Sequence, residues 1–419
     1  HIPKEYCNQL QILVLYHIGV MTRAEFYTEH TNHGYDQALA LYQATHPSIF
    51  ANLESFNDLA YERLIEEITF GFTNEGVHKE NSPAYHKGMI SNLIRARNIL
   101  KVLPYEDCVR SSNFFEDILN KALLFLACIV QPNRRVPILG DSENTQIAKS
   151  IKDLKSLTNY KYYIFSATNG EKGERPPSFM VFPKSGYAVF RKPISNNKTP
   201  AHDFHLVFKC GLLSRYHRHD DDLNILLYAY GEQWLIDSGM YNHQRKTPTR
   251  VYMRSMKAHN IPVINGFKPL RDPEIVDRNW GIRSYKEDEQ KGESVLAETG
   301  MFPNIRLQRH LFVTSSNIIY ITDRTIAQTC LPQAPSWLFH IPADKKIEIQ
   351  KNSVEIKSKH HTLVLSIKYP ENLNIKLFSG WNKKFPSVYS EKTNELKDSQ
   401  VLVISPETYN VCRFRLAFN

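Results

Sequence analysis

The chain has 419 residues, more than one compact core usually holds, so two domains are expected. Its composition is that of a globular protein, and no apolar run reaches the ~20 residues that span a bilayer. The net charge of +9 favours an anionic partner, such as an acidic polysaccharide, a nucleic acid or a membrane surface. Because the basic residues are scattered, we expect neither nucleic-acid binding nor membrane insertion. The six cysteines include no CxxC pair, which argues against a cysteine metal cluster.

Apolar residues recur at helical spacing through roughly the first 130 residues. Residues 148–177 are polar and end in the sequence GEKGERPP, which predicts a loop or linker between domains. We therefore expect a helical domain over residues 1–147. The spacing predicts helices over residues 6–20, 35–42, 53–70, 85–102 and 113–129.

Short β-rich runs separated by turn residues follow one another after Ser178. This pattern is typical of an antiparallel β-sandwich, which we predict over residues 178–419. The predicted fold class is therefore α+β and multidomain, with the helices first. The runs are residues 187–191, 204–209, 225–230, 234–237, 318–322, 346–349, 362–367 and 402–404.

The sequence SRYHRHDDDL, residues 214–223, places two histidines two positions apart at the start of a predicted hairpin. In an extended segment, His217 and His219 would project to the same side. Antiparallel pairing would bring Asp237, at the end of the returning strand, back near His219. A third histidine, His259, follows in the sequence KAHNIP.

Two imidazoles and a carboxylate suit zinc, with water or another group as the fourth ligand. The competing interpretation is that the histidines lie at the surface or are hydrogen-bonded in the core. The three aspartates, residues 220–222, are expected to form a solvated turn rather than to bind metal.

The longer sequence HRHDDDLNILLYAYGEQWLIDSGMY, followed by YMRSMKAHN at residues 252–260, resembles the β-domain of heparinase II/III-type polysaccharide lyases. That family has HxHxD, an apolar strand, DxGxY and then YxRS…AHN. Ile261 stands where the family usually has Thr. The sequences TNHGYDQ at 31–37, ENSPAYH at 80–86, GDS at 140–142 and KSGYAV at 184–189 resemble further elements of the family.

The likeness covers roughly residues 20–265 and implies an (α/α) toroid followed by a β-sandwich, an architecture shared with similar alginate lyases. Such lyases carry more helices ahead of the Asn-His element, so we expect an incomplete toroid here. The resemblance implies a bacterial periplasmic or secreted protein. No signal peptide is visible, and the start at His1 suggests a processed or trimmed chain.

The resemblance also implies β-elimination on a polysaccharide that contains uronic acid. This reaction must neutralise the uronate carboxylate, remove the proton at C5 and protonate the departing O4. The resemblance assigns Asn32 to the carboxylate and Tyr85 to the proton on O4. His33 and His217 are the candidates for the other proton transfer. A lowered pKa would let the Tyr85 phenol act as a base as well.

The resemblance makes His219, Asp237 and His259 a zinc site, expected to be structural, and assigns Arg254 and Tyr241 to substrate binding. Each assignment has an alternative: Asn32 as a helix N-cap, Tyr85 as a buried aromatic residue and Arg254 in a surface ion pair. His33 and His217 could each simply orient a neighbour.

Two other functions stay open. A glycoside hydrolase would need a pair of carboxylates, for which Glu80 and Asp221 are the nominees. A non-catalytic protein that binds or assembles glycans would need only the scaffold.

Overall fold

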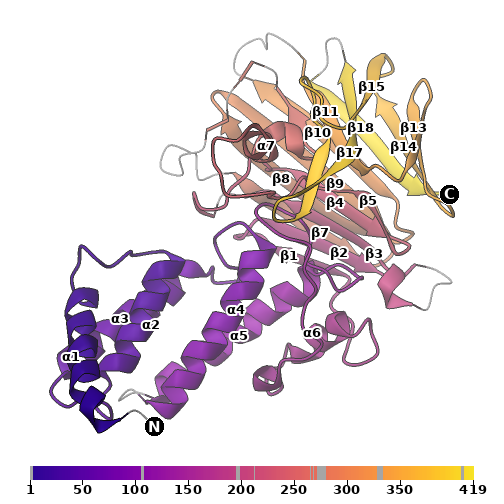
Figure 1. Cartoon of the computed structure of the whole chain (residues 1–419). Helices are drawn as coiled ribbons and strands as arrows, with labels where there is room; N and C mark the ends of the chain where they lie inside the picture. Colours follow the sequence, from indigo (N-terminus) through magenta and orange to yellow (C-terminus); the bar gives the residue numbers. More distant parts are fainter. Residues whose placement is uncertain are drawn as a thin grey trace. The chain divides into compact units, whose positions relative to one another are not determined.

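The computed structural model describes residues 3–104, 108–194, 199–211, 213–264, 266–267, 269–270, 280–327, 334–406 and 410–419. The chain divides into two compact units, one helical and one mainly β (Figure 1). Within the described residues, no helix combines the length and the apolar character that a membrane crossing requires. The helical unit comprises His1–His78 and Gly88–Ala122, and the β-rich unit comprises Lys79–Lys87 and Leu123–Asn419.

Helices form the first unit, as the apolar spacing predicts. Helix α2 packs against α3, and Asn57 of α3 donates from Nδ2 to the carbonyl oxygen of Tyr42 in α2 at 2.9 Å. The last two helices of this unit continue into the β-rich unit. The helices are α1 (Lys4–Met21), α2 (Asn32–Thr45), α3 (Glu54–Gly71), α4 (Pro83–Val102) and α5 (Cys108–Ile129).

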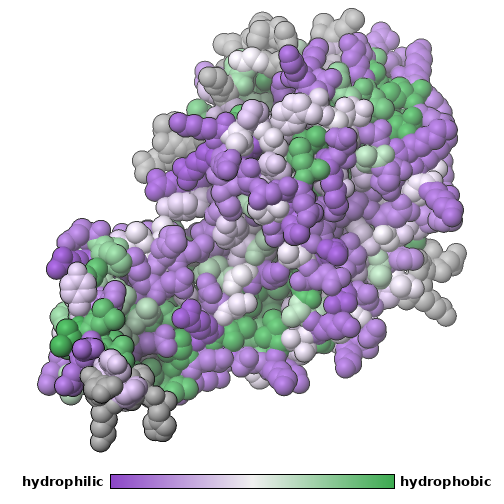
Figure 2. Space-filling model, viewed as in Figure 1, coloured by the Kyte–Doolittle hydropathy of each residue, from purple (hydrophilic) through white to green (hydrophobic). Residues whose placement is uncertain are grey.

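Helix α1 differs from α2 in how much apolar surface it exposes. Ile12 of α1 is 68% exposed, whereas Leu39 and Leu41 of α2 are fully buried. Figure 2 shows hydrophobic side chains at the surface over the helices of this unit. The exposed large apolar side chains of α1 are Tyr6, Leu10, Ile12, Leu13, Leu15 and Tyr16.

Residues 148–177, predicted to be a loop, contain a 3-10 turn (Lys152–Leu154) and helix α6 (Tyr160–Ala167). Tyr163 of α6 is buried, and its hydroxyl donates to the Ala148 carbonyl at 2.6 Å. The Ser166 hydroxyl donates to the Ala127 carbonyl at 2.8 Å. The prediction of a loop is wrong for residues 160–167, because the sequence YKYYIFSA forms a helix whose Tyr163 and Phe165 are buried despite its polar flanks.

The β-rich unit contains antiparallel sheets, as predicted, and each predicted run overlaps a strand, although further strands such as Gly292–Phe302, Ile305–Thr314 and Val411–Phe418 were not predicted. The first sheet has the order β1-β2-β3-β4-β5, so strands that follow one another in the chain are neighbours. Its strands are β1 (Phe179–Phe182), β2 (Tyr187–Lys192), β3 (Phe204–Lys209), β4 (Asn224–Ala229) and β5 (Glu232–Leu235).

Two further sheets complete the described part of this unit. The larger has the order β12-β13-β14-β18-β10-β9-β8-β7, and the smaller has β15-β17-β11-β6, with β16 paired to β17. Between β5 and β6 lie α7 (Pro248–Met253) and a 3-10 turn (Met256–Ala258). The strands are β6 (Pro262–Val263), β7 (Gly281–Asp288), β8 (Gly292–Phe302), β9 (Ile305–Thr314), β10 (Ile319–Ala327), β11 (Ser336–Pro342), β12 (Lys346–Ile349), β13 (Ser353–Lys357), β14 (Thr362–Tyr369), β15 (Leu373–Ser379), β16 (Val388–Lys392), β17 (Glu395–Pro406) and β18 (Val411–Phe418).

Side chains from all three of these sheets form one apolar core. Burial alternates along β9, as expected where one sheet face meets a core and the other meets solvent. Trp234 of β5 and Trp337 of β11 are fully buried in this core. The core holds β4 and β5 rigidly, and the connections on either side of this hairpin carry the candidate site.

Candidate active site

Three segments far apart in the sequence meet in the β-rich unit: residues 79–87, 140–142 and 214–219. The Asn81 side chain joins the first to the third, because its Nδ2 donates to the carbonyl oxygens of Ser214 at 3.0 Å and Tyr216 at 2.9 Å. The Ser214 hydroxyl returns a bond to the carbonyl oxygen of Lys79 at 2.8 Å. These bonds fix the start of α4 against the histidine-rich loop.

The turn at residues 140–142 fits closely against the same place. Gly140 has a φ of +58°, and a Cβ there would lie 2.6 Å from the Asn81 carbonyl oxygen, so the turn requires glycine. The Ser82 hydroxyl donates to the carbonyl oxygen of Asp141 at 2.9 Å and lies 2.8 Å from the Ser142 hydroxyl. The backbone of Asp141 is therefore held on both sides.

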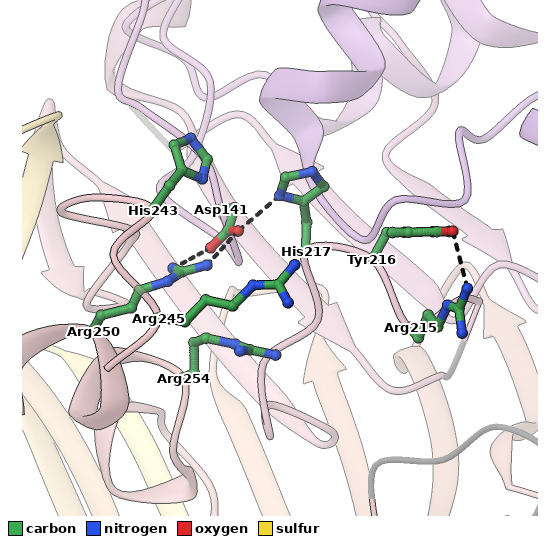
Figure 3. Close-up of a pocket in the computed structure, with 8 residues that line it drawn as sticks. All are labelled: Asp141, Arg215, Tyr216, His217, His243, Arg245, Arg250 and Arg254. Atoms are coloured by element: carbon green, nitrogen blue, oxygen red, sulfur yellow. Dashed lines mark hydrogen bonds and ion pairs between the residues drawn. The ribbon is translucent and has the colours of Figure 1, made fainter. Parts of the chain in front are cut away.

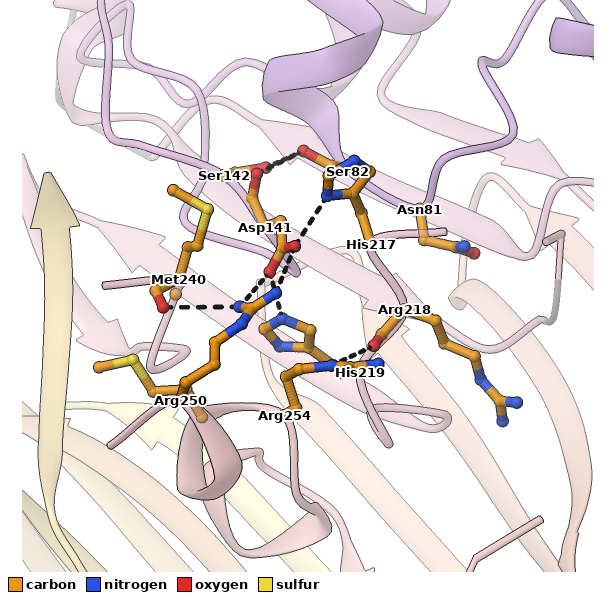
Figure 4. A network of polar contacts seen from close by, with 12 residues as sticks. Asn81, Ser82, Asp141, Ser142, His217, Arg218, His219, Met240, Arg250 and Arg254 are labelled. Atoms are coloured by element: carbon orange, nitrogen blue, oxygen red, sulfur yellow. Dashed lines mark hydrogen bonds and ion pairs between the residues drawn. The ribbon is translucent and has the colours of Figure 1, made fainter. Parts of the chain in front are cut away.

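The carboxylate of Asp141 is the centre of the polar network in Figure 4. His217 Nδ1 lies 2.8 Å from Oδ2, and His219 Nε2 lies 2.7 Å from Oδ1. The Arg250 guanidinium, on α7, donates to both oxygens. Burial alone would raise the pKa of Asp141, but the bonds from the two histidines and from Arg250 hold it well below its usual range. Asp141 is therefore ionised.

His217 adopts a left-handed backbone conformation, with a φ of +50°, so the segment is not extended as predicted. Non-glycine residues seldom adopt this conformation, and those that do are concentrated at functional sites. His217 and His219 nevertheless meet, because each binds a different oxygen of Asp141. The prediction that the two imidazoles come together is confirmed, but its geometric reason is wrong.

Tyr85, in the first turn of α4, stacks on His217 with ring centroids 3.9 Å apart. Glu80 Oε2 lies 3.5 Å from Nε2 of the same imidazole. Burial, followed by the charges of Asp141 and Glu80, raises the pKa of the Tyr85 hydroxyl to about 12. The phenol is therefore protonated at neutral pH, which suits a proton donor, and the surroundings do not supply the lowered pKa that a tyrosine base would need.

A pocket of about 560 Å³ opens beside this network (Figure 3). Arginine side chains dominate its lining, and its carboxylate, Asp141, is already bound by Arg250. The pocket is therefore positively charged and suits an anionic ligand. We call it the arginine pocket, lined by Asp141, Arg215, Tyr216, His217, His243, Arg245, Arg250 and Arg254.

Of the predicted substrate-binding residues, Arg254 lines this pocket and Tyr241 is not among the lining residues. Tyr241 packs instead against a small apolar cluster that includes Tyr252, Met253 and Val388. Sequence patterns did not predict roles for Asp141, Arg215, His243, Arg245 and Arg250. Only the GDS turn was a signal, for Asp141; Arg250 lies on α7 and the other three lie in loops, all outside the family motifs that predicted the site.

His219, Asp237 and His259 lie together, as predicted, with potential ligand atoms within 4.8 Å of one another. All three side chains are buried, and His259 Nδ1 lies 2.8 Å from Asp237 Oδ2. Within the described part of the chain, His219 Nδ1 and His259 Nε2 are buried without a hydrogen-bond partner. Buried polar atoms are seldom left unpaired, so a metal cation fits this cluster.

A second group could also hold a cation: Asp141, His217 and His243 offer ligand atoms within 4.8 Å in the arginine pocket. There, however, Asp141 already accepts hydrogen bonds on both oxygens, including a pair from Arg250. The cationic surroundings make this group the poorer metal site.

The three aspartates of the DDD sequence are buried, so the prediction of a solvated turn is wrong. Asp221 forms an ion pair with Lys209 on β3. Asp222 accepts from the Gly211 backbone at 2.9 Å and from the Thr299 hydroxyl at 3.1 Å. These partners make the burial of Asp221 and Asp222 possible, and the bonds tie the loop to the sheets.

Asn32 and His33 belong to the helical unit, at the start of α2. The N-cap of α2 is Thr31, whose side chain accepts from the Gly34 backbone, so Asn32 does not cap the helix. Within the described residues, the Asn32 amide has no hydrogen bond. Its assignment to substrate, like that of His33, stays a prediction.

Comparisons with known proteins agree with this description. The model of a family described as "Heparinase II/III-like, C-terminal" matches residues 174–411, and that of "Heparinase II/III N-terminus" matches residues 7–165. A heparin-sulfate lyase of Bacteroides thetaiotaomicron is 23% identical over 304 residues, which cover 66% of this chain and 41% of the relative.

Two solved structures share the fold. A heparan sulfate lyase from Pedobacter heparinus superposes with a TM-score of 0.78 at 16% identity, covering 99% of this chain and 63% of that one. A heparinase III superposes with a TM-score of 0.78 at 18% identity, covering 98% and 63%. The chain thus spans less than two thirds of the length of these relatives.

Proposed function

The chain belongs to the heparinase II/III family, and on this premise we propose that the protein is a polysaccharide lyase acting on an anionic polysaccharide that contains uronic acid. The observation that carries the proposal is the arginine pocket, because its lining combines an excess of positive charge with His217, on which Tyr85 stacks. Both features suit a reaction on a uronate, which brings a carboxylate and requires two proton transfers.

The reaction is a β-elimination. A base removes the proton at C5, the electron pair forms the C4–C5 double bond, and the C4–O4 bond breaks. The Tyr85 hydroxyl, protonated at neutral pH, gives its proton to O4. His33 and His217 remain the candidates for the base, and the stacking of His217 on Tyr85 supports His217. The products are a new chain end and a 4,5-unsaturated uronate.

The developing negative charge on the uronate carboxylate needs donors that are already oriented. Arg254 and Arg245 line the pocket and suit this task. Asn32 is the neutral donor that the family resemblance assigns to the carboxylate. The helical unit would form part of an (α/α) toroid, as the family resemblance implies. The names of the relatives make heparan sulfate the first polymer to test.

We infer that the cation of the His219, Asp237 and His259 cluster is zinc, because imidazole and carboxylate ligands suit it. When bound, it would cross-link the loop before β4 to the segments after β5 and α7, which is a structural role. The family resemblance supports a protein that would act in the periplasm or after secretion.

The alternative of a glycoside hydrolase is weaker. Its mechanism needs two carboxylates that face each other across the scissile bond. Asp221, one of the two nominees, is buried and paired with Lys209 rather than exposed in the arginine pocket. A non-catalytic glycan-binding protein would not need Tyr85, so removing its hydroxyl tests that alternative.

The test is to incubate the protein with heparan sulfate, heparin, hyaluronan, chondroitin sulfate and alginate, and to follow the ultraviolet absorbance of a 4,5-unsaturated uronate. We expect absorbance to rise with at least one polymer. Depolymerisation without absorbance would show hydrolysis instead. Binding without depolymerisation, unchanged in the Tyr85→Phe variant, would show a non-catalytic protein.

A further inference from the structure

Asp141 makes contacts that charge neutralisation alone does not explain. A single buried arginine would satisfy a carboxylate through a bidentate pair, as Arg309 does for Asp323 in the core of the same unit, with N–O distances of 2.8 and 2.6 Å. Asp141 receives such a pair from Arg250 and, in addition, one imidazole on each oxygen.

These contacts determine which nitrogen of each imidazole carries the hydrogen. An ionised carboxylate only accepts hydrogen bonds, so His217 Nδ1 and His219 Nε2 must both be donors. The Nε2 of His217, beside Glu80 and on the ring stacked with Tyr85, is then the nitrogen that can accept a proton. The Nδ1 of His219 is left with its lone pair, and this atom has no hydrogen-bond partner among the described residues.

We propose that Asp141 is a positioning residue that fixes two histidines in opposite tautomers, His217 as a proton acceptor and His219 as a metal ligand. One carboxylate would then link the metal cluster to the arginine pocket. The part that concerns His217 rests on the proposed lyase function, whereas the part that concerns His219 does not. An oriented carboxylate commonly sets the tautomer of a catalytic or metal-binding histidine, but here the same group serves both.

The backbone around Asp141 supports this role. Gly140 can approach the Asn81 carbonyl only because it lacks a Cβ, and Ser82 binds the carbonyl oxygen of Asp141 itself. Asn81 also holds the loop that carries His217, through the carbonyl oxygens of Ser214 and Tyr216. The turn that carries Asp141 and the loop that carries His217 are thus both anchored to residues 81–82, and a displacement of the turn would disturb the contacts of Asp141 with both imidazoles.

The substitution Asp141→Asn tests the proposal because it keeps the shape and changes only the hydrogen-bonding pattern. An amide offers one accepting oxygen and one donating nitrogen, so it cannot accept from both imidazoles in the present arrangement. Either His217 loses its free Nε2 lone pair, or His219 loses the lone pair that faces the metal cluster. Asp323→Asn is the matched control, since it alters an equally buried bidentate pair that, among the described residues, has no hydrogen bond from a histidine.

We expect one of two results for Asp141→Asn. If the variant keeps its zinc, kcat should fall on the order of 10³-fold with KM changed only a few-fold; otherwise, the variant should lose its zinc. Asp323→Asn should lower thermal stability and leave both the zinc content and the kcat of the folded protein unchanged. The conservative variant Asp141→Glu should recover part of what Asn loses, because it keeps the acceptor-only carboxylate. An Asp141→Asn protein with wild-type kcat and wild-type zinc content would overturn the proposal.

The tautomers can also be measured in the wild-type protein, so the proposal can be tested even if the Asp141 variants do not fold. In wild-type protein carrying ¹⁵N-labelled histidine, the nitrogen shifts should show a hydrogen on Nδ1 of His217 and on Nε2 of His219, assigned with single His→Gln variants. The opposite tautomer at either position would refute the inference. If no polymer is cleaved, the lyase function fails, but the zinc measurement and the His219 tautomer still decide the role of Asp141.

Discussion

Two pockets of the β-rich unit contain similar charged side chains but balance them differently. In the arginine pocket, one carboxylate faces a majority of cationic residues. In a second pocket, of about 360 Å³, each lysine is paired: Lys345 lies 2.8 Å from Glu232 and 2.6 Å from Asp344, and Lys397 binds Glu391. We call this one the ion-paired pocket, lined by Ile138, Gly231, Glu232, Gln233, Ile236, Pro342, Asp344, Lys345, Tyr389, Glu391 and Lys397.

The difference shows that charge balance, rather than the presence of basic residues or of a cavity, separates a candidate substrate site from a structural feature. Carboxylates already satisfy the lysines of the ion-paired pocket, so a polyanion would have to displace them and would gain little. Among the described lining residues of the arginine pocket, the carboxylate is that of Asp141, and it is bound by Arg250. Matched substitutions in the two pockets can test this contrast.

The largest effect is expected for Tyr85→Phe. Phenylalanine keeps the stacking on His217 but removes the proton donor, so kcat should fall on the order of 10³-fold with little change in KM. The matched control is Tyr389→Phe, which removes a hydroxyl from the ion-paired pocket and should leave kcat unchanged. Unsaturated uronate formation measures both. Equal activities of the two variants would remove Tyr85 from the mechanism.

The metal cluster gives the second contrast. We expect about one zinc per chain, and His219→Ala should lose it together with roughly 5–10 °C of thermal midpoint, because bound metal stabilises the folded state. His243→Ala removes a histidine of the arginine pocket and should retain the zinc. Elemental analysis and thermal unfolding measure the two outcomes. Loss of zinc from the His243 variant alone would move the metal site into the arginine pocket.

A smaller effect is expected for Arg245→Gln. Removing one exposed charge from the arginine pocket should raise KM for an anionic polymer several-fold at low ionic strength. The difference should shrink at about 1 M salt, where screening acts over about 3 Å. Lys397→Gln, in the ion-paired pocket, is the control and should leave KM unchanged at either salt concentration. A KM for Arg245→Gln that did not depend on salt would argue against an electrostatic role.

Much of the fold, and the metal cluster beside the arginine pocket, could be predicted from the sequence for physical reasons. Helical spacing and short alternating runs reflect burial directly, so the helices of the first unit and eight of the strands of the β-rich unit could be predicted from them. The metal cluster could be predicted because a hairpin brings Asp237 back beside His219, His259 follows shortly after in the sequence, and the resemblance grouped the three residues as one site. Helix α6 could not, since its flanks are polar and only the fold shows what its aromatic side chains cover.

The arginine pocket could be predicted only in part. Arg254 and His217 stand in recognisable motifs, whereas Arg215, Arg245 and Arg250 are single basic residues among 52 lysines and arginines. The aspartates at 220–222 were misjudged because their partners, such as Lys209 and Thr299, lie on other strands. Contacts between distant segments decide both cases, and spacing along the chain does not report them.

The smallest expected effect concerns the loss of stability at acidic pH. It separates the contribution of a buried histidine of the first sheet from that of the residues around the two pockets. Burial, together with the charge of Arg191, lowers the pKa of His205 to about 3, and His205 Nε2 bonds the Cys128 carbonyl at 2.9 Å. His205 is neutral when folded but takes up a proton near pH 6.5 when unfolded, so its contribution to stability is complete above that pH and is lost as the pH falls toward 3.

At about pH 5 this group should lower the free energy of unfolding by about 2 kcal/mol relative to about pH 7.5. His205→Gln keeps a donor for the Cys128 carbonyl and cannot titrate, so chemical denaturation of this variant should show that much less dependence on pH. The exposed His360→Gln is the control and should keep the wild-type dependence. If His205→Gln folds and its stability still falls as in the wild type, the acid sensitivity belongs to other groups, and the histidine-rich network around Asp141 becomes the next to test.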